Sequence, residues 1–249
     1  MRVWLVRIAG AVGVLLTLCA LTFLWLHEPL PSATPSSEAD VLARQIASSV
    51  DTTAWSETGA IEWTFAGRTT HLWDRDRGLL RVRWDTTEVL LNLTTMQGHA
   101  TVSGAAVSAA ERDALSAQAY SRWINDAFWL NPLASLFDEG TTRALVTVGG
   151  VEGLLLTYGA GGETPGDSYL WVVGPDGRPT SWRMWVSIIP MGGVACSWED
   201  WQQLPTGAWI STRHRGPFGS ALVISDVRAG ASLAELMDGA DPFAQIMSP

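Results

Sequence analysis

The sequence predicts an α+β fold: one large, curved antiparallel sheet with two or three helices on its concave side, after one N-terminal transmembrane helix. Three observations favour it. An uncharged apolar segment lies near the N-terminus, about ten or eleven strand-like segments follow in quick succession between turn residues, and only two long helical patterns interrupt them. Because strands do not alternate with long helices, a parallel sheet is not expected.

The apolar N-terminal segment covers residues 8–26. At about 1.5 Å rise per residue, a helix of this length spans roughly 28 Å, close to the thickness of the bilayer core. Arg2 and Arg7 precede it, so the positive-inside rule places residues 1–7 in the cytoplasm and the rest of the chain outside. The Pro- and Ser-rich residues 27–37 read as an extended linker to one domain, 38–249.

Two alternatives to an anchor remain for this segment, namely a cleaved signal peptide and a lipoprotein signal ending at Cys19. The apolar run continues past Ala20, and Leu18 stands where a lipoprotein signal needs a small residue. An uncleaved anchor is therefore favoured. All three possibilities place the domain on the extracytoplasmic side, periplasmic or extracellular.

Helical patterns occur at 38–55, where Ser37 and Asp40 form a capping box, and at 106–128, where Ser108 and Glu111 form another. Pro132 after Asn131 indicates a short helical turn, and a further short helix is expected at 232–238. Alternating apolar residues predict strands at 61–65, 80–84, 89–93, 142–148, 153–159, 168–174, 179–189, 194–201, 207–214 and 219–227.

Composition limits the classes of function. Of the 249 residues, 47% are hydrophobic and 14 are Trp, which excludes a disordered chain. The formal net charge of −9 argues against a nucleic-acid partner, because an acidic domain repels a phosphate backbone. Cys19 and Cys196 lie in different segments, so no disulfide is expected within the domain. The four histidines have no zinc-binding spacing, and we expect neither a metal nor a cofactor.

The abundance of Trp on predicted strands has two interpretations. One is a cavity for a hydrophobic ligand, a lipid or an acyl chain. Its candidate lining residues are Trp63, Trp84, Leu156, Tyr169, Trp171, Trp182 and Trp185. The other is a filled, Trp-rich core, because indole rings can occupy a wide gap between a curved sheet and its helices.

Four charged residues, Asp126, Asp138, Arg143 and Asp167, stand beside bulky apolar residues and are expected to converge in one structural hydrogen-bonded network. A less favoured interpretation is a hydrolase that uses Asp126, Asp167 or Asp74. His71 and Asp74 do not form a catalytic pair in this view, because residues three apart on a strand point to opposite faces. No catalytic residue is assigned.

A series of motifs resembles an uncharacterised family of exported bacterial envelope proteins. The motifs are Trp63-Thr64-Phe65 with Gly67, His71 with Trp73-Asp74, Asn125-Asp126 with Phe128-Trp129-Leu130, Thr164-Pro165-Gly166-Asp167-Ser168-Tyr169-Leu170-Trp171, Met184-Trp185-Val186, and Pro190 with Gly192-Gly193. The layout is similar to the half-barrel lipoprotein carriers of the bacterial envelope (LolA/LolB-like). This resemblance implies a half-barrel that encloses a site for acyl chains, and a lipid or lipoprotein as ligand; fold alone does not fix function.

The function expected from these observations is a membrane-tethered extracytoplasmic protein that binds a hydrophobic ligand in a half-barrel cavity. The alternative is a non-catalytic envelope interaction module with a filled core. The interior of the domain discriminates between the two, because a ligand-binding protein needs a cavity of several hundred Å³.

The topology yields a first prediction. The apolar sequence that follows Cys19 should leave the anchor uncleaved, so intact-mass analysis of the membrane fraction should recover residues 1–37 attached to the domain. A mature N-terminus at Leu21, or a diacylated Cys19, would contradict it.

Overall fold

The computed structural model describes residues 4, 13, 14, 17, 23, 26–159, 165–239 and 241–247. The expected cytoplasmic residues 1–7 and the expected anchor, 8–26, lie mostly outside this set. Among the helices that are described, none has both the length and the apolar character needed to cross a membrane.

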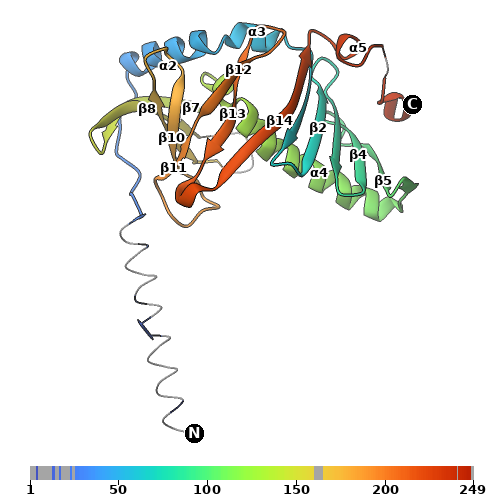
Figure 1. Cartoon of the computed structure of the whole chain (residues 1–249), viewed down its shortest axis with the longest axis horizontal. Coiled ribbons are helices and arrows are strands. Elements are labelled where there is room, and N and C mark those ends of the chain that lie inside the picture. The colour runs from blue at the N-terminus through green and yellow to red at the C-terminus, as the bar shows by residue number, and fades with distance from the viewer. Residues whose placement is uncertain are drawn as a thin grey trace.

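The strands form two antiparallel sheets (Figure 1). The nine-stranded sheet has the order β12-β13-β14-β1-β2-β3-β4-β5-β6 and the five-stranded sheet the order β11-β10-β9-β8-β7. The first contains β1 (Ala60–Phe65), β2 (Thr69–Asp74), β3 (Leu79–Trp84), β4 (Thr87–Asn92), β5 (Gly98–Val102), β6 (Ala105–Ala106), β12 (Glu199–Gln203), β13 (Trp209–Arg215) and β14 (Ala221–Gly230). The second contains β7 (Thr141–Val148), β8 (Val151–Tyr158), β9 (Ser168–Val173), β10 (Pro179–Trp185) and β11 (Val194–Ser197).

The two sheets are joined at Trp198, the single residue between β11 and β12. Its backbone N–H donates to the carbonyl of Thr180 on β10 at 2.7 Å. On the other side, the N–H of Arg215 at the end of β13 donates to the Ser197 hydroxyl at 2.9 Å. One stretch of chain thus belongs to both sheets. The expected α+β fold with antiparallel strands is confirmed, but the strands form two sheets that meet at this joint and not the one large sheet that was expected.

The long helix α4 (Ala109–Leu130) packs on one face of the nine-stranded sheet, which we call the inner face. It begins as predicted, since the Ser108 hydroxyl accepts from the N–H of Glu111 at 3.3 Å. Its buried residues include Ala119, which packs against Leu80, Val82 and Leu91 of the sheet. Apolar positions alternate with polar ones along most of β1 and β3 because this face is covered by the helix.

The single helix expected at 38–55 is wrong, because the chain breaks it into α2 (Ser37–Ser49) and α3 (Thr52–Ser56). Asp51 adopts a left-handed backbone (φ 52°), which an α-helix cannot contain, and its carboxylate then accepts from the N–H of Ala54 to begin α3. α3 contacts η1 (Pro132–Ser135), the 3₁₀ helix that follows the end of α4, so it reaches the region where α4 ends.

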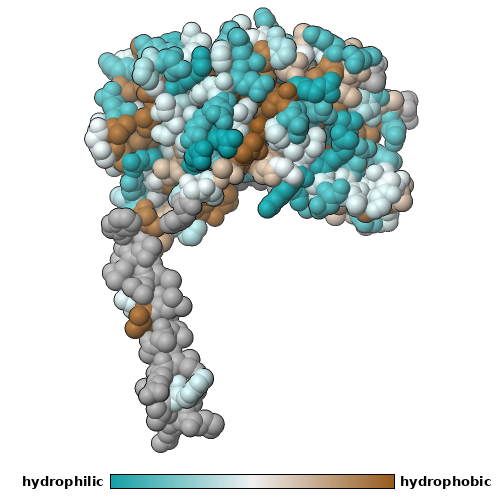
Figure 2. All heavy atoms as spheres, in the orientation of Figure 1, coloured by the Kyte–Doolittle hydropathy of each residue, from teal (hydrophilic) through white to brown (hydrophobic). Residues whose placement is uncertain are grey.

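The opposite, outer face is covered in part by the C-terminal segment. Leu233 and Leu236 of α5 (Leu233–Leu236) pack with Phe243 against outward-facing leucines of the sheet, Leu72, Leu79 and Leu90. A last helix, α6 (Ala244–Met247), follows. The visible surface is otherwise mostly hydrophilic, with apolar residues in small groups (Figure 2).

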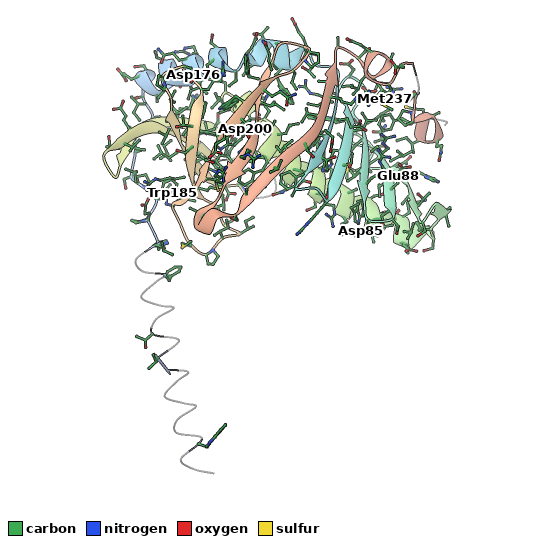
Figure 3. The ribbon with its side chains drawn as sticks, viewed as in Figure 1. Asp85, Glu88, Asp176, Trp185, Asp200 and Met237 are labelled. Carbon is green, nitrogen blue, oxygen red and sulfur yellow. The ribbon has the colours of Figure 1, made fainter. Side chains whose placement is uncertain are left out.

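The linker is bonded to the domain at both of its ends. The N–H of Glu28 donates to the carbonyl of Gly192 at 3.0 Å, and the Trp185 indole N–H donates to the carbonyl of Glu28 at 2.8 Å. The Glu28 carboxylate also pairs with Arg183. At the other end, the N–H of Ser36 donates to the carbonyl of Arg143 on β7. Figure 3 shows Trp185 beside the place where the chain enters the domain.

Two buried histidines give the fold a pH dependence. Burial lowers the pKa of His214, 1% exposed, from 6.5 to about 4, and burial also lowers the pKa of His71. The unfolded chain therefore takes up protons near pH 6.5 that the native protein does not. As the pH falls from 6.5 towards 4, the free energy of unfolding should decrease by about 3 kcal/mol through His214 alone.

Urea denaturation at pH 7, 6 and 5 measures this loss. His214→Gln should reduce the dependence on pH relative to the unaltered protein, whatever its effect on stability at pH 7. Equal pH dependence in the variant and the unaltered protein would show that His214 is not the group responsible.

Candidate functional site

A cleft of about 550 Å³ opens between α3, the end of β2, the C-terminal half of α4 and the 3₁₀ helix η1 (Pro132–Ser135). This volume lies within the range of small-molecule binding sites. Its walls are largely aromatic, and its lining residues are Thr52, Trp55, Ser56, Trp73, Arg75, Tyr120, Trp123, Ile124, Ala127, Phe128, Asn131, Pro132, Ala134 and Ser135.

The periodicities of strands and helices explain why the aromatic side chains of β2 and α4 line the cleft. Trp73 shares the inner face of β2 with His71, two residues away. Tyr120, Trp123 and Ala127 recur at spacings of three and four along α4, so they lie on one side of that helix. Trp73 and Trp123 meet edge to face, with ring centroids 5.0 Å apart and planes at 77°. Trp55 comes from α3, so its position depends on the helix break at Asp51.

Arg75 follows β2 directly and is the one charged side chain in this lining. Its guanidinium carbon lies 4.7 Å from the ring centroid of Trp55 and 5.2 Å from that of Trp73, so it makes cation–π contacts with both. Its Nη1 donates to the backbone carbonyls of Trp55 and Thr58. Burial lowers the pKa of Arg75, and the negative charge of the neighbouring Asp76 acts in the opposite direction.

Four lining residues carry a buried polar atom with no hydrogen-bond partner in the part of the chain that the structure describes. These atoms are Arg75 Nε, Trp73 Nε1, Trp123 Nε1 and Asn131 Nδ2. All four are hydrogen-bond donors. Asn131, expected to cap the following turn, makes no side-chain cap bond, and this leaves its amide unused. Among the described residues, neither a carboxylate nor a histidine lines the cleft.

The sequence-predicted ligand residues lie elsewhere. Leu156, Tyr169, Trp171 and Trp182 come together in one cluster between α2 and the five-stranded sheet. Its rings are in close contact, for example 4.8 Å between Tyr169 and Trp182 and 4.9 Å between Trp171 and Trp182. Their packing fills this part of the interior.

The other three candidates are dispersed. Trp63 stacks on His71 at 4.6 Å, in the core of the nine-stranded sheet. Trp84 lies near the middle of α4, under the guanidinium of Arg122 at 5.0 Å. Trp185 faces the outer side and contacts the linker. None of the seven lines the cleft, whose walls include Trp55, Trp73 and Trp123 instead.

Asp126 of α4 forms a buried pair with His71 of β2. The distance from His71 Nε2 to Asp126 Oδ2 is 2.7 Å, and the two side chains are 0% and 6% exposed. The Asn125 amide donates to the second carboxylate oxygen at 2.9 Å. Because a carboxylate can only accept a hydrogen bond, His71 donates its Nε2–H to Asp126. His71 and Asp74 are not partners, as expected; Asp74 pairs with Arg77 at 2.6 Å.

The single network expected of Asp126, Asp138, Arg143 and Asp167 is wrong. Arg143 Nε donates to Asp40 of α2 at 2.6 Å, Asp138 is exposed, and Asp167 accepts from the N–H of Ser187 at 2.9 Å. Arg143 lies on the edge strand β7, beside the first turn of α2, and that neighbour is far away in the sequence. The carboxylates considered for hydrolysis therefore belong to separate sets of contacts, and none lines the cleft.

These contacts predict unequal effects on stability. Asp126→Ala should lower the free energy of unfolding by about 3–5 kcal/mol, because it leaves a buried histidine without its partner. Asp40→Ala removes a carboxylate from a partly exposed pair, with side chains 17% and 37% exposed, and should cost about 1 kcal/mol or less. Chemical denaturation of both variants at pH 7 makes the comparison. Similar losses would show that the His71–Asp126 bond is no stronger than a surface pair.

No family model matches the sequence, and neither does any curated protein. Among solved structures, a DUF1329 family protein from Desulfovibrio piger matches with 11% identity, covering 80% of this chain and 96% of that one, at a TM-score of 0.40. A putative outer membrane lipoprotein-sorting protein domain from Vibrio parahaemolyticus matches with 8% identity, covering 75% and 93%, at a TM-score of 0.28.

Proposed function

We propose that this chain is a membrane-tethered extracytoplasmic protein that binds a hydrophobic ligand, a lipid or another molecule with an acyl chain, in the cleft between α3, β2, α4 and η1. The observation that carries the proposal is the 550 Å³ cleft with its walls of Trp55, Trp73, Trp123 and Phe128. Aromatic side chains supply large apolar contact areas, and an alkyl chain can lie against several of them at once.

The hydrophobic effect gives the expected strength of binding. Each buried methylene contributes about 0.8 kcal/mol, so about eight of them can offset the cost of association and give affinity near the micromolar range. A single alkyl chain of this length fits the size class of the cleft. The cleft, and not the packed cluster around Trp182, is therefore the place where this energy is gained.

A second candidate function is an interaction module, and a specific observation favours it. Trp63, Trp171 and Trp182 are fully buried, so much of the interior between sheets and helices is filled by the protein's own side chains. A filled core needs no ligand for its stability. The two functions differ at the cleft, which a pure interaction module would not use for small molecules.

The docked linker supports tethering close to the membrane. Only residue 27 separates the end of the apolar segment, at residue 26, from Glu28, which is bonded to Gly192, Trp185 and Arg183. Two residues span at most about 7 Å. The β10–β11 hairpin would thus lie near the bilayer surface.

The proposed ligand site can be tested in the full chain reconstituted into nanodiscs. A hexadecanoate that carries a photoreactive diazirine is added, irradiated, and its adducts are mapped by peptide mass spectrometry. Adducts should concentrate on the segments that contain Trp55, Trp73 and Trp123. Ala127→Trp should reduce this labelling roughly tenfold or more by filling the cleft.

Ala110→Trp is the matched control, because it adds the same indole to α4 at an exposed position outside the cleft. It should leave the labelling of the three Trp segments unchanged. Thermal denaturation of both variants verifies that they fold. Adducts confined to residues 8–26, or equal labelling of the two variants, would contradict ligand binding in the cleft and favour the interaction module.

A further inference from the structure

The structure assigns an anionic head group to the ligand of this cleft: we infer that the molecule is an amphiphile whose carboxylate or phosphate binds beside Arg75. The inference rests on the proposed function, because it specifies the chemistry of a ligand at the same site. The anionic group is the polar end of that ligand, and the aromatic walls of the cleft contact its apolar end.

Arg75 makes no ion pair among the described residues. Most described arginines have a carboxylate within 4.0 Å, including Arg77, Arg81, Arg143 and Arg183. Arg75 donates to the carbonyls of Trp55 and Thr58 instead, and the nearest charge that acts on it, Asp76, lies beyond ion-pair distance, although the Arg75 side chain is partly buried. A buried charge is costly unless a group of opposite charge compensates it. A ligand anion in the cleft would supply that compensation.

The buried polar atoms of the cleft lining that have no partner among the described residues are all hydrogen-bond donors. The Nε of Arg75 and the amide of Asn131 are buried donors without acceptors, as are the indole N–H groups of Trp73 and Trp123. A buried donor that makes no hydrogen bond costs about 1–3 kcal/mol of stability. Several such donors in one cleft therefore need a physical explanation. Carboxylates and phosphates present several acceptor oxygens and no obligatory donor, so they fit this set, whereas an ammonium head group does not.

The position of the guanidinium is fixed before any ligand binds. Trp55 and Trp73 contact it, and Nη1 is held by two backbone carbonyls. Little side-chain freedom is then lost when an anion binds, which favours affinity. The planar fork of Arg also suits two oxygens of one anion. In a protein with a net charge of −9, such a local cation determines where an anionic molecule can bind.

Competition against the photoreactive hexadecanoate tests the head group in the full chain, in nanodiscs of neutral lipid at pH 8. The competitors share one alkyl chain and differ at the head: dodecanoate, dodecyl phosphate and the neutral dodecan-1-ol. Both anions should displace the probe at concentrations about tenfold or more below that of the alcohol. If dodecyl phosphate competes better than dodecanoate, the source is a phosphate head group, and the reverse order indicates a fatty acid.

Arg75→Gln should abolish the preference for the anions, and Arg75→Lys should retain part of it because the charge remains. Arg122→Gln is the matched control: Arg122 is also partly buried, stacks on a Trp and has no carboxylate within ion-pair distance among the described residues, but it does not line the cleft. It should keep the preference, and thermal denaturation verifies the fold of each variant.

The outcomes separate the two proposals. If dodecan-1-ol competes as well as the anions in the unaltered protein, or if Arg75→Gln keeps the preference, the anionic head group is wrong and hydrophobic binding stands. If the probe does not label the cleft at all, the proposed function itself fails.

Discussion

The bond between His71 and Asp126 constrains the rest of this structure, because it ties α4 to the middle of the nine-stranded sheet. A carboxylate on the buried side of α4 must have a partner, and the Nε2–H of His71 on β2 provides it at 2.7 Å. The rotation of α4 about its axis is thereby fixed. Once Asp126 faces His71, Trp123 and Ala127 on the neighbouring positions of the helix are turned towards Trp73 and α3, where the cleft forms.

The cleft is the place where four elements approach without closing the space between them. α4 ends at Leu130, η1 turns away, and α3 is a separate short helix because Asp51 leaves the helical conformation. A continuous helix from residue 38 to 55 would carry Trp55 in another direction. The site therefore depends on the helix break, which brings Trp55 over Arg75. Arg75 in turn donates to the backbone carbonyls of Trp55 and Thr58 at the end of this segment.

Much of the fold could be predicted from the sequence where one face of an element is apolar. Strands β1 and β3 alternate clearly, and Ser108 begins α4 as its capping box predicts. β5 was missed because only Ala100 of its five residues is buried, so no alternation exists. The site could not be predicted in this way. Arg75 stands in a segment that reads as a turn, and its importance arises from Trp55 and Trp73, which only the tertiary fold brings to it. The partner of Arg143, Asp40, was missed for the same reason.

The aromatic residues divide into two groups, one in the core and one at the cleft. The rings around Trp182 lie about 5 Å from one another and pack between α2 and the five-stranded sheet. The cleft of about 550 Å³ belongs to the size class of single small ligands. Under the proposed function, the core rings therefore stabilise the fold, and the ligand is bound by Trp55, Trp73 and Trp123. Its binding then depends on the helix break at Asp51, which positions Trp55.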